Sequence, residues 1–223
     1  MKFLFTVIGS IFSLALSAQT IQFKIDGTIE SNKNAKYAYL TTLSQQIPIS
    51  SDKIFIKVPV INGHFEFNGN FELEGRNLQF ANIFFDERDN ITKDEIALKF
   101  KNIIWVSGRD NHIVRMILEN MTLQVKGKDE AKGAIIIENG ILTKQFNVFS
   151  QFLRNDDVTK LIAFIKANSD SPISLNALDA ICSFYKDDLK NLNETIPNLF
   201  NILSPKIKEG KDGQEMKKKW NIK

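Results

Sequence analysis

The only cysteine of the chain, Cys182, is the first candidate for chemistry. A reactive thiol is typically exposed and surrounded by positive charge, whereas a free cysteine inside a fold behaves as a small apolar residue. Cys182 falls in a helical pattern that places Leu175, Leu178 and Tyr185 on the same face. We therefore interpret it as an unreactive core thiol. The functional alternative is a disulfide with a cysteine of another protein.

A single thiol limits the chemistry of the whole chain. It cannot form an internal disulfide, a CxxC redox pair or a cysteine-based zinc cluster. Two-electron thiol exchange within this chain is excluded as well, because no second thiol is present to resolve a mixed disulfide.

The two histidines, His64 and His112, are the next candidates. His64 follows a predicted turn and is expected to point to solvent, opposite Phe65. His112 lies in a polar turn close to Ser107 and Asp110, so the three residue types of a Ser-His-Asp triad occur together in this part of the sequence. Residues so close in sequence rarely reach the geometry of a catalytic triad, and we expect no such site.

Acidic side chains gather in two short stretches, residues 86–89 and Asp94-Glu95. Carboxylate oxygens bind Ca²⁺, but a calcium loop needs ligands at ordered intervals, which these stretches lack. A solvated loop is the simpler interpretation. No residue set predicts a catalytic site, a metal site or a bound cofactor.

The chain has 18 phenylalanines. Alternating rings such as Phe65 and Phe67 are typical of the buried face of a strand. Phe80, Phe84 and Phe85 have two interpretations, a sandwich core or an exposed apolar patch that binds a partner. We favour the core.

Strand patterns occupy residues 20–140. Ile21–Ile25 alternates apolar and polar residues before Asp26-Gly27, and Asn62-Gly63 is the preferred pair for a tight hairpin turn. Further strands are predicted at Ala35–Leu40, Ser51–Val60, Asn77–Phe85, Ile96–Val106, Val114–Leu118, Leu123–Lys126 and Ala134–Ile137. This spacing predicts an antiparallel β-sandwich.

Helical periodicity begins after Gly140. Residues 141–223 predict about four short helices: one over Thr143–Leu153, one after Asp156-Asp157, one after Pro172, and one capped by Thr195 and ending near Leu203. The lysines of the tail predict a dispersed, solvated face. The fold class is therefore mainly β with a C-terminal α region.

The N-terminus has the three parts of a secretory signal peptide. Lys2 is followed by an apolar run over residues 3–16 and by small residues up to Ala18. We expect residues 1–18 to be removed and the mature protein to be periplasmic or secreted. The apolar run is shorter than the roughly 20 residues that span a membrane, and no later segment approaches that length.

Composition excludes other classes. A hydrophobic content of 43% indicates a packed core. A net charge of +3, without aromatic residues among the tail lysines, does not indicate nucleic-acid binding.

Several segments resemble one known family, the exported thiol:disulfide interchange proteins of Bacteroidetes. In that family a domain of unknown function and a helical linker precede a thioredoxin-like domain. The β-rich part resembles the domain of unknown function at Phe23–Thr28, Ile61–Gly69, Ile117–Asn120 and Leu123–Gly127. Phe164–Leu175 and Leu199–Lys208 are similar to the linker.

The resemblance implies fold and ancestry only. The CxxC residues of the family's thioredoxin domain have no counterpart in this chain, so the resemblance implies no catalytic residue. We expect a non-catalytic, exported interaction module that binds an envelope protein or peptide. The alternative is an accessory half of a thiol:disulfide system whose thioredoxin-like domain is on another chain.

Overall fold

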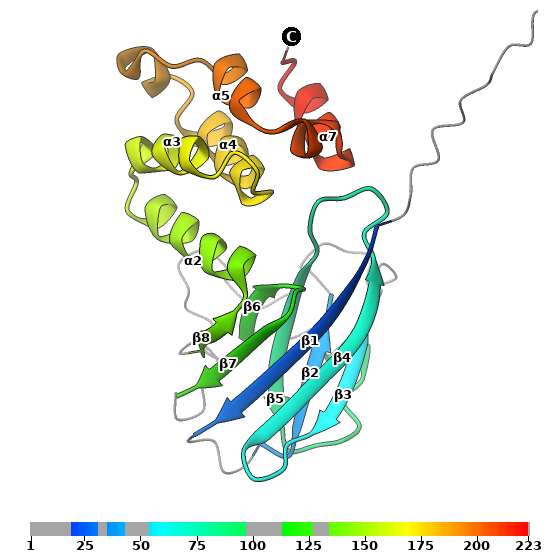
Figure 1. The fold of residues 1–223 in the computed structure, drawn as a ribbon. Helices are drawn as coiled ribbons and strands as arrows, with labels where there is room; N and C mark the ends of the chain where they lie inside the picture. Colours follow the sequence, from blue (N-terminus) through cyan, green and yellow to red (C-terminus); the bar gives the residue numbers. More distant parts are fainter. Residues whose placement is uncertain (1–18, 31–34, 43–53, 97–112, 127–133, 223) are drawn as a thin grey trace, which may run out of the picture.

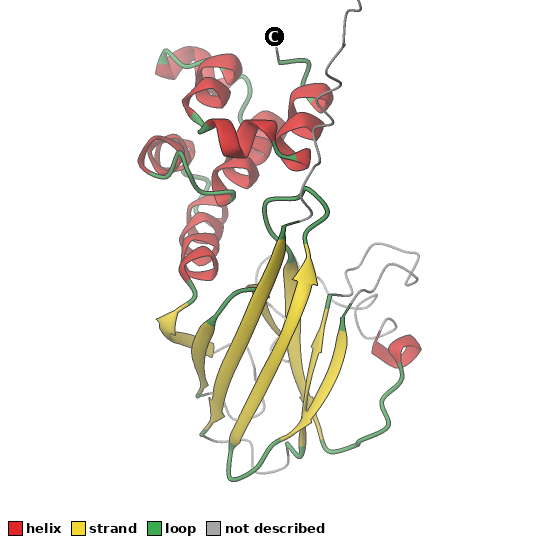
Figure 2. Ribbon diagram, turned by 45° about the vertical axis from the view of Figure 1, so that its right-hand side comes forward, coloured by secondary structure: helices red, strands yellow, loops and turns green. Residues whose placement is uncertain are grey.

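The computed structural model describes residues 19–30, 35–42, 54–96, 113–126 and 134–222. The described strands form two four-stranded sheets, and the helices that follow them gather at one end of these sheets (Figures 1 and 2). The predicted class, mainly β with C-terminal helices, is confirmed. The predicted signal peptide, residues 1–18, lies outside the described residues.

The first sheet has the order β4-β1-β7-β8 and the second has the order β3-β2-β5-β6. The strands of the first are β1 (Thr20–Ile29), β4 (His64–Glu72), β7 (Met121–Val125) and β8 (Ala134–Asn139). Those of the second are β2 (Tyr37–Thr41), β3 (Phe55–Pro59), β5 (Phe80–Asp86) and β6 (Ile113–Ile117).

One strand pair departs from the predicted antiparallel arrangement. β1 and β7 run parallel, with Ile25 opposite Met121 and Ile29 opposite Val125. The other neighbouring pairs of the described strands are antiparallel. Alternation along a strand fixes which face is buried but not which strand lies beside it, so the sequence did not reveal this parallel pair.

β1 is longer than its alternating segment suggested. It continues through Asp26-Gly27 to Ile29, because Gly27 accommodates a neighbouring ring. A Cβ at Gly27 would lie 2.1 Å from the tip of Phe65, its cross-strand partner on β4. Phe65 and Phe67 are both buried between the sheets, as predicted.

The Asn62-Gly63 turn forms as expected. Both residues have positive φ, 52° and 76°, and Ile61 and His64 exchange two backbone hydrogen bonds of 2.9 Å. The strands on either side lie in different sheets, however, since β3 pairs with β2 and β4 pairs with β1. The turn therefore carries the chain from one sheet to the other.

The outer face of the second sheet carries its own small core. Tyr39 and Phe84 stack with ring centroids 4.9 Å apart, and Ile91 and Ile96 pack against them. Ile96 lies in a helical segment, described over residues 93–96, where a strand was predicted to begin. The rest of that predicted strand lies outside the described residues.

The four predicted helices are present. They are α2 (Ile141–Arg154), α3 (Val158–Ala167), α4 (Ile173–Phe184) and α5 (Ile196–Ile202). Asp157 caps α3 by accepting from the backbone N–H of Lys160 at 2.9 Å, and Thr195 caps α5 by accepting from Asn198 at 3.3 Å. A 3₁₀ turn, η3 (Asp188–Leu192), lies between α4 and α5.

The lysine-rich tail is more structured than predicted. It forms α6 (Pro205–Glu209) and α7 (Lys211–Lys219). Isolated lysines indicate solvated positions, but Ile207 and Met216 supply enough apolar surface to bury one side of these short helices.

The tail also contacts the β-sandwich. The carboxylate of Asp212 accepts from Arg76 at 2.5 Å and from the backbone N–H of Asn77 at 2.8 Å. The backbone N–H of Lys211 donates to Gly75 at 2.8 Å. We call these contacts between α7 and the loop joining β4 to β5 the α7 latch.

Candidate functional site

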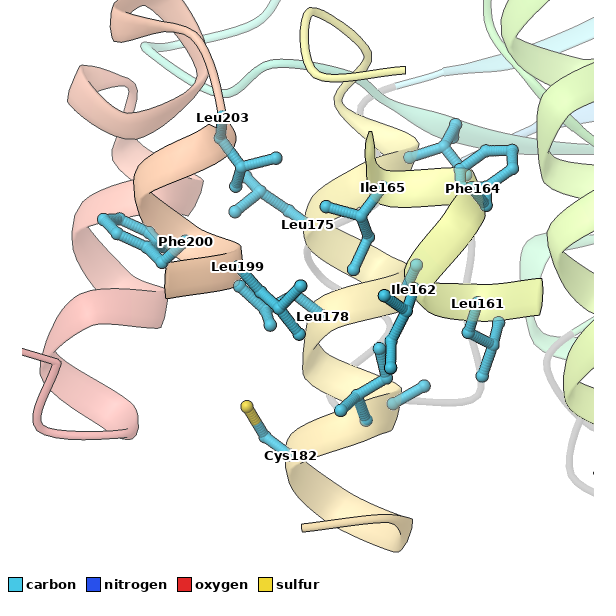
Figure 3. Packing of buried hydrophobic residues seen from close by; sticks show 14 of the residues in the cluster. Leu161, Ile162, Phe164, Ile165, Leu175, Leu178, Cys182, Leu199, Phe200 and Leu203 are labelled. Atoms are coloured by element: carbon cyan, nitrogen blue, oxygen red, sulfur yellow. The ribbon is translucent and has the colours of Figure 1, made fainter. Parts of the chain in front are cut away.

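Cys182 lies where its helical pattern predicted. Its side chain is 3% exposed and belongs to the core cluster formed by the helices. In Figure 3 its sulfur points from α4 toward the side on which Leu199 and Phe200 of α5 lie. The predicted burial of the thiol is confirmed.

The surroundings of Cys182 oppose ionisation. Burial, assisted by the negative charge of Asp179, raises the pKa of the thiol to about 11, although Lys219 and Lys186 act in the other direction. The thiolate is the nucleophile of cysteine chemistry, so very little of the reactive form exists near neutral pH. These features favour the unreactive core thiol over the disulfide alternative.

A second polar group lies at the end of the same helix. The Tyr185 hydroxyl donates to Asp156 at 2.5 Å. Burial and this carboxylate raise the pKa of Tyr185 to about 12, so the phenol stays a hydrogen-bond donor. Asp156 has a φ of 56° in the turn between α2 and α3. The contact therefore joins α4 to that turn, which is a structural role.

The histidines form no catalytic set within the described residues. His64 is exposed, and its Nε2 lies 3.2 Å from the carboxylate of Asp26. The predicted position of His64, in solvent and opposite the buried Phe65, is confirmed. Ser107, Asp110 and His112 lie outside the described residues.

Each acidic stretch contains one carboxylate that forms an ion pair with Arg88. Arg88 contacts Asp86 at 3.2 Å and Glu95 at 2.9 Å. Glu95 also accepts from the backbone N–H of Thr92 at 2.9 Å, and Thr92 accepts from the N–H of Glu95 at 3.2 Å. This reciprocal pair is a capping box. Asp94-Glu95 thus begin a helical turn rather than the predicted solvated loop, and the described residues contain no acidic or histidine cluster suited to a metal ion.

The three phenylalanines with two interpretations are all packed. Phe84 is buried in the small outer core, and Phe85 makes an edge contact with Phe65 at 5.3 Å between centroids. Phe80 contacts Phe146 of α2 at 5.1 Å and so joins the sandwich to the helices. None of the three rings forms an exposed patch, but the predicted sandwich core holds only for Phe85, since Phe84 lies in the outer core and Phe80 packs against the helical core.

Seven large apolar side chains of the described residues are exposed. Four of them occur within fourteen residues of chain, Ile135 and Ile137 on β8 and Ile141 and Val148 on α2. We call these four residues the β8–α2 ridge. Figure 1 shows α2 rising directly from the end of β8, at one edge of the sandwich. Sequence patterns missed this ridge because the same residues also fit a buried strand and a core helix.

The junction that positions the ridge was also missed. Glu119, in the turn between β6 and β7, accepts from the backbone N–H groups of Leu142 and Thr143 at 3.2 and 2.7 Å. The Thr143 hydroxyl in turn accepts from the N–H of Ile117 at 3.0 Å. Glu119 therefore caps α2 from a distance of more than 20 residues in sequence, whereas cap patterns in a sequence are local.

Comparison with protein-family models, curated proteins and solved structures finds no match for this chain. Among the described residues, no helix combines the length and apolar character that crossing a membrane requires.

Proposed function

We propose that this protein is a non-catalytic, exported binding module and that the β8–α2 ridge is its binding surface. The export part of the proposal rests on the tripartite N-terminus. The resemblance to the non-thioredoxin half of exported thiol:disulfide interchange proteins supports the same setting. The binding part rests on the ridge.

The ridge supports the proposal because its four exposed apolar side chains come from one stretch of fourteen residues across the β8–α2 junction. Single exposed apolar residues are ordinary on protein surfaces, but a concentration of them marks an interaction site. Ile135 and Ile137 are 46% and 49% exposed on one edge strand. Ile141 and Val148 are seven residues apart and so share one face of α2.

Because Cys182 is buried, we expect a partner to bind non-covalently rather than through a mixed disulfide. A mixed disulfide requires access to the thiol as well as ionisation, and both are suppressed in this core. We therefore expect the partner to bind equally well with and without reductant.

The test is affinity capture from envelope extracts with the immobilised mature protein. The binding variant is Ile137→Asp combined with Ile141→Asp, which places charge on the ridge. The matched control is Ile61→Asp, because Ile61 is equally large and 63% exposed but lies in the turn before β4.

We expect the captured protein to be lost with the ridge variant and retained with the control, irrespective of reductant. Equal capture by both variants would contradict the assignment of the ridge. Capture of a thioredoxin-like chain that disappears in reductant and in Cys182→Ser would favour the accessory role in a thiol:disulfide system instead.

A further inference from the structure

β8 is an edge strand of the first sheet, because no other described strand lies beyond it. It pairs with β7 on one side. A strand at the edge of a sheet presents backbone N–H and C=O groups that an added strand can pair with. Natural proteins commonly protect such edges with charged residues, proline or a β-bulge. Ala134–Asn139 contains no lysine or proline, and its one charge is that of Glu138, beside a register irregularity.

The outward side chains of β8 suit a β-branched neighbour. Ile135 lies opposite Gln124 on β7, and a register irregularity follows between Thr122 and Leu123. The irregularity leaves Ile137 without a counterpart on β7 and brings Glu138 opposite Thr122. The edge therefore offers two exposed isoleucines followed by a carboxylate.

The carboxylate completes a row across the sheet. Glu66 on β4 lies opposite Asp26 on β1, which lies opposite Thr122 on β7, which lies opposite Glu138 on β8. Two of the three carboxylates have cationic or histidine neighbours. Lys24 lies 2.7 Å from Glu66, and His64 lies 3.2 Å from Asp26.

Glu138 differs from the other two carboxylates. It is exposed, and no Lys, Arg or His of the described residues forms an ion pair with it. A fifth strand beside β8 would place one of its side chains next to Glu138, where an opposite charge is favourable and a like charge is unfavourable.

We propose that β8 binds an extended segment of a partner protein by strand addition, and that this segment carries a Lys or Arg beside Glu138 and β-branched residues beside Ile135 and Ile137. This inference rests on the proposed function and specifies the partner's chemistry. Strand addition draws affinity from backbone hydrogen bonds and specificity from alternate side chains.

A second copy of the chain fits the edge less well. Two β8 strands paired about Ile136 would bring Ile135 against Ile137 but would set Glu138 against Ala134, so the carboxylate would gain no cation. The six-residue edge is also short for a stable dimer, which typically buries about 1,200–2,000 Å².

The experiment uses the mature protein and three blocked synthetic peptides. The first is Thr-Val-Lys-Val-Thr-Val, the second has Glu in place of Lys, and the third has Pro in place of the second Val. Binding is followed by titration of a fluorescent label and by backbone amide NMR shifts. We expect the Lys peptide to shift amides of β8 and to bind about two- to fivefold more tightly than the Glu peptide. The Pro peptide should bind least, because it lacks a ladder donor.

Charge reversal provides the decisive variant. Glu138→Lys should reverse the preference, so that the Glu peptide binds more tightly. Glu72→Lys, on the same sheet but on its opposite edge strand β4, should leave the preference unchanged. An unreversed preference in Glu138→Lys, or amide shifts confined to other strands, would overturn the inference. Self-association that shifts β8 amides without peptide would assign the edge to a second copy and overturn it as well.

The two experiments distinguish failure of the binding module from failure of strand addition. If the ridge variant loses its captured partner while the peptides show no charge reversal, the binding module stands and strand addition by a basic segment falls. If the ridge variant retains its captured partner and the peptides do not bind, both fall.

Discussion

At the scale of single residues, Cys182 shows how position decides chemistry. A thiol flanked by Lys186 and Lys219 has positive charge in its vicinity, which favours ionisation. Burial among the helices outweighs that effect, and the pKa rises instead. The same residue would be a reactive group on the surface and is an apolar packing group here.

Cys182 should therefore resist labelling in the native protein. We expect slow reaction with a maleimide in native buffer and fast reaction after denaturation, measured by mass spectrometry. Cys182→Ser should lower the free energy of unfolding by about 1–3 kcal/mol, because it buries a hydroxyl in an apolar site. Cys182→Ala should cost less than Leu178→Ala, for which about 2–5 kcal/mol is expected. Fast native labelling with no loss of stability in Cys182→Ser would contradict the core assignment.

The buried thiol and phenol also predict instability in alkali. Folding raises the pKa of Cys182 from 9.0 to about 11 and that of Tyr185 from 10.0 to about 12. Their neutral forms are favoured in the folded state, so the unfolded chain loses these protons first. This contribution to stability is complete below about pH 9 and is lost as the pH rises toward 12.

Urea unfolding between pH 8 and 11 measures this effect. The midpoint should fall with pH in the native sequence and fall less steeply in the double variant Cys182→Ala with Tyr185→Phe. Equal slopes in the two proteins would show that other groups govern the alkaline response.

At the scale of elements, the helices are fixed by contacts that are distant in sequence. Glu119 caps α2 from the turn between β6 and β7, and Asp212 holds α7 against the loop between β4 and β5. Short helices such as α6 and α7 are marginal alone. Their stability depends on these contacts and on the burial of Ile207 and Met216.

Asp212→Ala should loosen α7. The ion pair with Arg76 is partly exposed and contributes less than a buried pair, while the hydrogen bond to the Asn77 amide adds a similar amount. We expect a loss of about 1 kcal/mol, seen as faster hydrogen exchange in α7 with little change in β1 and β4. Glu215→Ala removes the longer, 3.3 Å contact to Arg76. It should change the free energy of opening of α7, measured by hydrogen exchange, by less than about 0.5 kcal/mol. Equal effects of both substitutions would show that Asp212 contributes no more than Glu215 to the α7 latch.

At the scale of the whole molecule, the sandwich and the helices form connected cores. Ile117 of β6 belongs to the helical core cluster, and Leu78 and Phe80 pack against it from the β part. The β8–α2 ridge lies where these parts meet, so the proposed binding surface combines a sheet edge with a helix face. A partner bound there would contact both parts of the fold.

The proposed export predicts the first residue of the mature chain. In a native-like bacterial host, the secreted or periplasmic product should begin at Gln19 or within one residue of it, because small residues precede that position. N-terminal sequencing of the fractionated protein measures this directly. A bulk product that retains Met1 would contradict the signal peptide and, with it, the proposed location.

The local features of this fold follow from residues that are close together in the chain. Alternation placed Phe65 and Phe67 in the core, the Asn62-Gly63 pair specified a tight turn, and Asp157 and Thr195 marked two helix starts. The stripe containing Cys182 predicted its burial. Each of these features depends on residues within about one turn or one strand. Local patterns in the sequence are therefore sufficient to predict them.

The way in which these elements meet depends on contacts between distant parts of the chain. The parallel pairing of β1 with β7, the cap on α2 from Glu119 and the α7 latch each join residues roughly 20 to 140 positions apart. The exposure of Ile135 and Ile137 is of the same kind, because an apolar strand is buried or exposed according to what lies beside it. A β-branched run predicts a strand, but its place at the edge of the described sheet follows from its pairing with β7.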